Sequence, residues 1–162
     1  MVFHSHPMVS KHPLSIRLEF SSTFDMVDFV EVVGGHVSRD IGLDEDSVHW
    51  VGVAIRECVI NAIKHGNQHD ISKRVFVEFA TALQGVPEMI IRVRDQGSGF
   101  DPEAIADPLA PENLLKGSGR GIFLIRNFMD EVDLQRAPQG GMEVRMVKRG
   151  QTIAESDTSV GI

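Results

Sequence analysis

The chain has 162 residues, of which 42% are hydrophobic and 24% are charged, and its formal net charge is −7. These values are typical of one globular domain with a substantial core, and they exclude wholesale disorder. The acidic balance excludes a general surface for nucleic acid or an anionic membrane, since either needs clustered Lys and Arg. The single Cys58 excludes an internal disulfide framework, and no apolar run is long enough to span a membrane. We therefore expect a cytoplasmic, single-domain protein.

The first part of the chain predicts a strand and then a helix. Apolar and polar residues alternate from residue 14 to residue 20, as in a half-buried strand. Apolar side chains at helical spacing follow the N-cap candidates Ser21-Ser22-Thr23. The pair Gly34-Gly35 lowers the helix propensity of the second half of this segment, so the sequence leaves the end of the helix open.

A second helix is expected from the N-cap Asp44 to about His65, and Gly66 would end it in a left-handed conformation. The segment 96–118 is rich in Gly and Pro, and a loop of that length in a compact domain is usually functional or disordered. The remaining pattern predicts strands at 73–80, 88–95, 131–136 and 142–148 and a helix over 122–129. This order implies an α+β layer with helices on one face of a sheet.

The second helix carries a polar stripe that its apolar face does not explain. Glu57, Asn61 and His65 follow one another at intervals of four residues, and Lys64 falls within the same arc. A solvated face is the simplest explanation of a single Glu–Asn pair, but a carboxamide oxygen can also ligate Mg²⁺ while a nearby carboxylate holds a hydroxyl for attack. Cys58 lies on the apolar stripe, so we expect it to pack in the core rather than react.

Two glycine-rich segments follow in the second half of the chain. Asp95-Gln96-Gly97-Ser98-Gly99-Phe100 places an acidic residue at the end of a predicted strand, where it can accept a hydrogen bond from a ligand's amine. Taken alone, this pattern is also a common turn. Gly117-Ser118-Gly119-Arg120-Gly121 opens the next helix, where free N–H groups can form a cradle for phosphate. The second segment matches neither a Rossmann fingerprint nor a Walker A loop.

In their order and spacing, these segments resemble the GHKL (Bergerat-fold) ATP-binding superfamily. Residues 57–66 are similar to its N box, residues 95–100 to its first glycine box and residues 117–125 to its second. Within the superfamily, the chain most resembles the anti-sigma-factor serine/threonine kinases of bacterial sporulation and stress response. The run from residue 119 to residue 132 is especially similar to theirs.

The resemblance covers roughly residues 14–149 and implies a histidine-kinase-like ATP-binding domain there, with flexible termini at 1–13 and 150–162. The implied fold is α+β, a two-layer Bergerat-type sandwich with a mixed, mostly antiparallel sheet. The implied function is that of an anti-sigma factor, which sequesters a sigma factor and uses ATP and Mg²⁺ to phosphorylate a STAS-domain anti-anti-sigma protein. Such kinases are commonly homodimers, and an apolar surface near the first helix and strand can serve that role.

The resemblance also implies roles for individual residues. Glu57 would be the general base, Asn61 would ligate Mg²⁺, and Asp95 would bind the adenine amino group. The other residues that would contact the nucleotide are Lys64, His65, Gly97, Gly99, Lys116, Gly117, Gly119, Arg120 and Gly121. The family often has Gly-Thr where this chain has Gly141-Met142, and this removes a hydroxyl expected near the phosphates or the lid.

Two other functions stay open from the sequence. A non-catalytic switch module would bind ATP without transferring its phosphate, although the presence of Glu57 argues against this function. A stand-alone histidine-kinase-like catalytic domain would need a His-bearing dimerisation helix, and none of the seven His residues lies in such a context.

Overall fold

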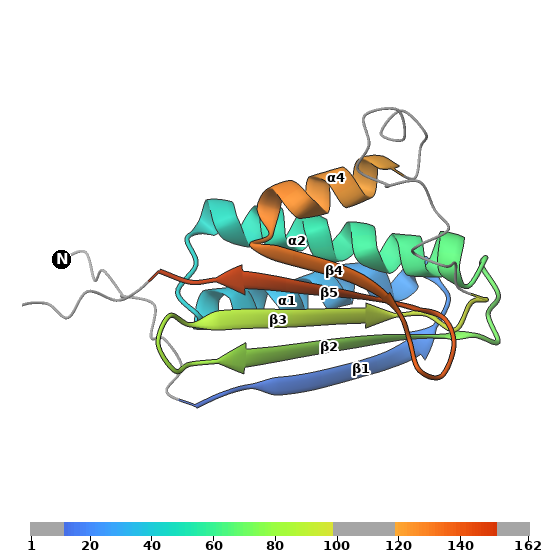
Figure 1. The fold of residues 1–162 in the computed structure, drawn as a ribbon, viewed down its shortest axis with the longest axis horizontal. Helices are drawn as coiled ribbons and strands as arrows, with labels where there is room; N and C mark the ends of the chain where they lie inside the picture. Colours follow the sequence, from blue (N-terminus) through green and yellow to red (C-terminus); the bar gives the residue numbers. More distant parts are fainter. Residues whose placement is uncertain (1–11, 99–118, 152–162) are drawn as a thin grey trace, which may run out of the picture.

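The computed structural model describes residues 12–98 and 119–151, which form a five-stranded sheet with helices over one face (Figure 1). The α+β architecture and the coverage of one sheet face agree with the prediction. The described elements, in chain order, are β1 (Ser15–Ser21), a 3₁₀ turn η1 (Phe24–Met26), α1 (Val27–Asp40), α2 (Glu45–Asn61), a π-helical turn η2 (Ala62–Gly66), β2 (Arg74–Ala82), β3 (Glu88–Arg94), α4 (Gly119–Phe128), β4 (Glu131–Arg136) and β5 (Met142–Arg149).

The sheet has the strand order β1-β2-β3-β5-β4, and each of its four pairings is antiparallel. The expectation of a mixed sheet is therefore wrong for the described strands. The chain passes from β3 through α4 to the edge strand β4, which runs in the same direction as β3 but does not pair with it. The turn after β4 then reverses the chain, so that β5 lies between the two strands and is antiparallel to both. This pairing places the end of β3 next to the start of β5, where Arg94 lies opposite Glu143.

The core lies between the sheet and the helical layer. Along β2, Val75, Val77 and Phe79 point into the core and are at most 1% exposed, while the intervening residues are half-buried. This alternation is the pattern that the sequence showed for the strand. No helix within the described residues is both long and apolar enough to cross a membrane.

Helix α1 runs without interruption through Gly34-Gly35 and ends at Asp40. Gly34 is buried, and a Cβ on it would collide with the Cδ1 atom of Ile55 on α2 and lie 3.4 Å from the Phe79 ring. The glycine therefore allows α1 to approach both α2 and the sheet. Helix packing here offsets the low helix propensity of glycine.

Helix α2 begins where the sequence predicts, because the Asp44 side chain accepts a hydrogen bond from the Ser47 N–H at 2.7 Å. Its end differs from the prediction. Gly66 does not take the left-handed conformation, and the positive φ angles fall instead at Gln68 (50°) and His69 (58°). The physical reason is that the helix widens into the π-helical turn, in which the N–H of Asn67 donates to the Ala62 carbonyl at 2.8 Å. The reversal is thereby delayed by two residues.

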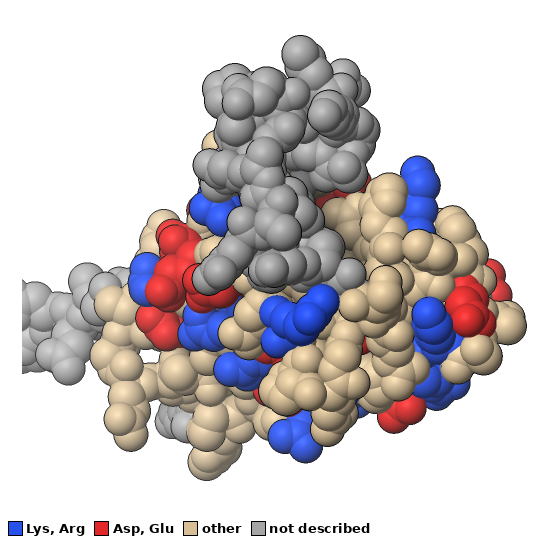
Figure 2. Space-filling model, turned by 45° about the vertical axis from the view of Figure 1, so that its right-hand side comes forward, with Lys and Arg blue, Asp and Glu red and all other residues tan. Residues whose placement is uncertain are grey.

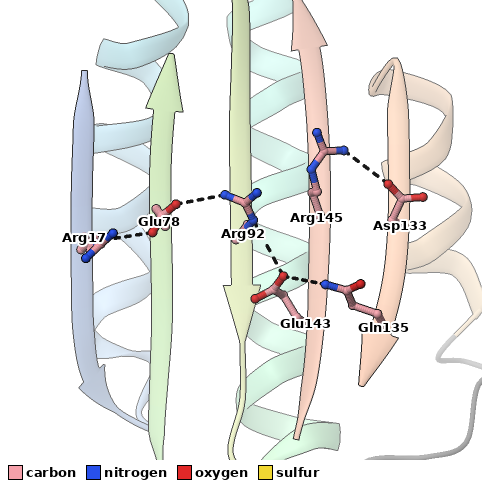
Figure 3. Close-up of polar contacts among 7 residues, drawn as sticks. All are labelled: Arg17, Glu78, Arg92, Asp133, Gln135, Glu143 and Arg145. Carbon is pink, nitrogen blue, oxygen red and sulfur yellow. Dashed lines mark hydrogen bonds and ion pairs between the residues drawn. The ribbon is translucent and has the colours of Figure 1, made fainter. Parts of the chain in front are cut away.

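Paired charges cover the sheet face that lies opposite the helices (Figure 3). Glu78 accepts from Arg17 on β1 and from Arg92 on β3, with N–O distances of 3.0 Å in both cases. Glu143 on β5 continues the row with a 3.8 Å contact to Arg92. Ion pairs at such half-exposed positions contribute little stability, but they keep this face polar.

We predict that Gly34→Val lowers the free energy of unfolding by about 1–3 kcal/mol, because the larger side chain overpacks the junction with Ile55 and Phe79. The matched control is Gly35→Ala, whose Cβ would meet its nearest neighbour, Arg39 Nη1, at an ordinary 3.4 Å. This control should raise stability by about 0.5–1 kcal/mol through helix propensity. Urea titration of both variants measures the difference, and equal stability of the two would contradict the packing role of Gly34.

Candidate functional site

The end of α2 brings together the carboxylate and carboxamide that the sequence singled out. Glu57 and Asn61 lie one helical turn apart, and both are half-buried. They face the start of α4, where a Cβ built on Gly121 would lie 3.0 Å from Glu57 Oε2 and 3.1 Å from Asn61 Nδ2. Within the described residues, neither side chain makes a hydrogen bond or an ion pair. The structure therefore holds both polar groups beside a helix N-terminus, with no partner for either among residues 12–98 and 119–151.

Asp95 lies directly after β3 and is 5% exposed. Its Oδ1 atom accepts hydrogen bonds from the N–H groups of Gly97 at 2.9 Å and Met142 at 3.1 Å. Its own N–H donates to the Met142 carbonyl at 3.0 Å. The other oxygen, Oδ2, lies close to Gly66 and has no hydrogen-bond partner among the described residues. One carboxylate oxygen is thus fixed by the protein, and the other can accept a hydrogen bond from a ligand.

Three glycines allow backbone to approach Asp95 from different sides. A Cβ on Gly66 would collide with the Asp95 carboxylate, and one on Gly97 would collide with the carbonyl of Gly66. Gly141 has a φ of +80°, and a Cβ there would collide with the Asp95 carbonyl. Because any side chain at these positions would displace the turn, glycine is required for the local geometry. Gly66 consequently serves close approach rather than helix termination.

Helix α4 lies against α2 and is anchored at the end remote from Gly121. The ring of Phe128 stacks on Trp50 with a centroid distance of 4.2 Å and an interplanar angle of 11°. The Phe128 carbonyl also accepts a hydrogen bond from Lys148 Nζ at 3.0 Å, which satisfies one of the free carbonyls at the helix end. These contacts hold the first turn of α4, the positive end of its dipole, beside Glu57 and Asn61.

The structure places some of the other predicted residues and not the rest. Lys64 and His65 are exposed on the π-helical turn between the Glu57–Asn61 pair and Gly66. On the face shown in Figure 2, Lys and Arg side chains are interspersed with Asp and Glu. The backbone of Gly119, Arg120 and Gly121 forms the start of α4. Gly99, Lys116 and Gly117 lie outside the described residues.

The position of Met142 differs from the one expected for the Thr hydroxyl that the family often has here, which was near the phosphates or the lid. It is 5% exposed, and both its N–H and its carbonyl bind Asp95. The Met side chain therefore belongs to the Asp95 half of the site, not to the half around Glu57 and Asn61. The backbone contacts do not depend on the side chain, so the substitution leaves the hold on Asp95 intact.

The sequence reasoning missed Asn67, which is fully buried beside the Asp95 turn. Its Oδ1 accepts from the N–H of Gln96 at 2.7 Å, and its Nδ2 donates to Ser22 Oγ at 2.7 Å and to the Arg74 carbonyl at 2.9 Å. Gln96 and Ser22 are 29 and 45 residues away from Asn67, so no periodic pattern revealed the residue. The available signal was an Asn directly after a helix and beside a motif glycine.

Cys58 packs in the core as expected. It is 2% exposed, and its Sγ atom lies 3.6 Å from the sulfur of Met146. Burial raises the pKa of the Cys58 thiol far above its usual range, and the nearby Glu57 carboxylate raises the pKa further. The thiol therefore stays protonated and unreactive at neutral pH.

Comparisons with known proteins agree with this geometry. Residues 22–148 match the family model described as "Histidine kinase-like ATPase domain". The chain is 32% identical to an anti-sigma F factor of Oceanobacillus iheyensis over 83% of this chain and 91% of the relative. It is 31% identical to the anti-sigma F factor of Bacillus subtilis (82% and 90% covered) and 26% identical to the serine-protein kinase RsbW of Staphylococcus aureus (82% and 85% covered).

A solved structure supports the fold. The mycobacterial sensor histidine kinase MprB matches with a TM-score of 0.51 over 86% of this chain and all of that chain. Because the sequence identity is 15%, the likeness shows the shared fold alone.

We predict that native protein reacts with a thiol reagent such as DTNB at pH 8 at least about 100-fold more slowly than protein unfolded in guanidinium chloride. Both burial and the raised pKa keep the thiolate of Cys58 out of reach of the reagent. Absorbance at 412 nm measures the rate, and the unfolded sample is the control. Equal rates in the two states would contradict the buried position.

Proposed function

The chain belongs to the histidine kinase-like ATPase domain family, and we propose that it is an anti-sigma factor with ATP-dependent protein serine/threonine kinase activity. The observation that carries this proposal is the placement of Glu57 and Asn61 against the first turn of α4. A base, a metal-ligating amide and a phosphate cradle then lie together, with Asp95 beside them to bind a nucleobase.

ATP fits this site with its base at Asp95 and its phosphates at α4. Oδ2 of Asp95, which has no partner among the described residues, can accept a hydrogen bond from the exocyclic amine of adenine, and Gly97 belongs to the same turn. Backbone N–H groups of Gly119 and Gly121 would bind phosphate oxygens, aided by the helix dipole. Four basic residues are candidates to balance the phosphate charge: Lys64, His65, Lys116 and Arg120. The remaining glycines assigned to the pocket by resemblance are Gly99 and Gly117.

The donor set at the end of α2 fits a magnesium ion. Mg²⁺ prefers oxygen ligands, is usually held by one or two protein groups together with phosphates and water, and neutralises charge on the β- and γ-phosphates when bound. Asn61 supplies an amide oxygen in a half-buried position, and the absence of a side chain at Gly121 leaves room beside it. We assign the metal contact of the protein to Asn61.

Glu57 would act as the general base of the transfer. Its carboxylate accepts the proton of a serine or threonine hydroxyl on the protein substrate as that oxygen attacks the γ-phosphorus and ADP leaves. Phosphoryl transfer needs mainly positioning and electrostatic stabilisation, which the fixed start of α4 supplies. The substrate must reach Glu57 from outside, which is possible because this carboxylate is only half-buried and has no partner among the described residues.

The partners follow from the names of the relatives and from the resemblance. The anti-sigma F factors and the serine-protein kinase imply a sigma factor as one partner. The phosphoacceptor would be a STAS-domain anti-anti-sigma protein, and both interactions would take place in the cytoplasm without direct contact to nucleic acid. The folded domain over residues 14–149 would carry both activities.

The proposed homodimer would use the apolar surface of the first helix and strand. Phe29 is 50% exposed and Val32 is 69% exposed on α1, and Phe24 is 49% exposed on the preceding turn. Helix α1 packs on β2, the neighbour of the edge strand β1, whose residues Ile16 and Leu18 are only half-buried. Large exposed apolar side chains on neighbouring elements are typical of interaction sites.

We predict that Glu57→Gln lowers phosphate transfer to a STAS-domain substrate by about 10²–10⁴-fold, because the amide cannot accept the hydroxyl proton. ATP affinity should change by less than about twofold, since the variant preserves size and polarity. Transfer is measured with γ-labelled ATP and Mg²⁺, and binding by calorimetry. The comparison variant Asp95→Asn should instead weaken ATP binding by about tenfold or more, because its amide can present a donor toward the adenine amine.

Two other outcomes would contradict parts of this proposal. Tight ATP binding by the wild type without transfer to any STAS protein would favour the non-catalytic switch module. Absence of ATP binding, together with no effect of Asp95→Asn, would overturn the assignment of this site.

We predict that Val32→Asp shifts the wild-type dimer toward monomer by at least about tenfold in dissociation constant, because it places a charge in the apolar surface. Val86→Asp is the matched control, since Val86 is also exposed (40%) but lies in the turn between β2 and β3. Sedimentation velocity over a concentration series measures both. A monomeric wild type, or equal effects of the two substitutions, would contradict this interface.

A further inference from the structure

We propose that Asn67 is a positioning residue for nucleobase recognition, because it holds in place the turn that carries Asp95. This inference rests on the proposed function, in which Asp95 binds the adenine amine. Asn67 makes no contact with the base in this scheme. It acts through the peptide group that follows Asp95.

The Asn67 side chain joins three segments that meet at one end of the sheet. Its Oδ1 accepts from Gln96 after β3, and its Nδ2 donates to Ser22 after β1 and to Arg74 at the start of β2. All three distances are 2.7–2.9 Å, and the residue has no exposed surface. An amide that is fully buried and fully paired is a rigid tie, since losing any partner would leave a buried polar group unsatisfied.

The N–H of Gln96 lies beyond the reach of the sheet ladder. The last residue pair between β2 and β3 is Phe76 with Arg94, so the peptide that joins Asp95 to Gln96 has left the strand pairing. Asn67 supplies its partner instead. The Gln96 side chain strengthens the tie, because its Oε1 accepts from the Arg74 N–H at 2.7 Å.

This tie determines the direction of the Asp95 carboxylate. The peptide before it is fixed by the bond from the Asp95 N–H to the Met142 carbonyl, and the peptide after it is fixed by Asn67. The Oδ1 atom is held by Gly97 and Met142, so Oδ2 has one remaining orientation. Without Asn67, the backbone of the turn would keep its connection to β5, and the only remaining link to β2 described here would be the flexible Gln96 side chain.

Asn67 also relates the two halves of the site to one another. Its N–H bonds the carbonyl of Ala62, directly after Asn61, and so fixes the residue to the π-helical turn that extends α2. Asn67 thereby connects the turn that carries Asp95 to the helix that carries Glu57 and Asn61, through its side chain on one side and its backbone on the other. Only an amide fits this position, because it combines an acceptor for Gln96 with donors for Ser22 and Arg74.

The test compares affinities for ATP and for inosine triphosphate, which has a carbonyl oxygen in place of the exocyclic amine of ATP. We expect the wild type to prefer ATP. Asn67→Ser, which is too short to reach Gln96, should lower the ratio of the two affinities by about three- to tenfold, the loss expected from a misplaced hydrogen bond. The affinity for inosine triphosphate should change by less than about twofold, whereas general destabilisation would weaken both nucleotides alike.

Two further variants separate positioning from stability. Ser22→Ala removes one acceptor of Asn67 but leaves the bond to Gln96, so it should lower the melting temperature and preserve the preference for ATP. Asn67→Asp keeps an acceptor for Gln96 and loses the donors, so it should also preserve the preference within about twofold. If Asn67→Ser fails to fold, a loss of the preference by about threefold or more in Asn67→Asp would by itself contradict the proposal. Loss of the preference in Asn67→Asp to the same degree as in Asn67→Ser would overturn the proposal.

The outcomes distinguish this inference from the proposed function. If the wild type binds ATP and inosine triphosphate equally, Asp95 does not recognise the amine, and both the proposed base site and the inference fail. If the wild type prefers ATP and Asn67→Ser retains the full preference in folded protein, the inference alone fails.

Discussion

The buried carboxylate of Asp95 is the contact on which the arrangement of the site depends. It joins the end of β3 to the start of β5 by accepting two backbone hydrogen bonds, and glycines permit the close approach of the neighbouring backbone. A buried carboxylate is stable only when such donors replace its water. Because Asp95 needs these backbone donors, segments that are far apart in sequence are held together around it. Its second oxygen can then accept a hydrogen bond from a ligand, at the same end of the sheet as Glu57 and Asn61.

The helical layer supplies the second half of the site by a different principle. Helices α2 and α4 lie together, with the first turn of α4 on Glu57 and Asn61 and its last turn on Trp50. One end of α4 is therefore set by aromatic packing, while the other places a helix N-terminus beside Glu57 and Asn61. The aromatic packing of the last turn thus fixes the direction of the α4 dipole at the first turn. A fixed dipole suits phosphoryl transfer, because that chemistry depends on charges held in place.

Local patterns predicted most of the fold and both halves of the site. Alternation found β2 and β3, the capping residue Asp44 located the start of α2, and helical spacing grouped Glu57 with Asn61. The misses share a cause, since each depends on a contact between distant segments. Gly66 is shaped by Asp95 rather than by its own helix, Gly34 by Ile55 and Phe79, and the buried Asn67 by three strand ends. Such contacts leave no periodic trace in the sequence.

The paired charges on the outer sheet face have a consequence for how the molecule meets other proteins. Arg17, Glu78, Arg92 and Glu143 form a continuous row of alternating sign across four strands. A partner that covered this row would strip water from charges that already satisfy one another, and it would gain little attraction in return. Other proteins are therefore expected to bind this sheet face weakly. Binding to the helical layer, or to the end of the sheet where Asp95 lies, is favoured instead.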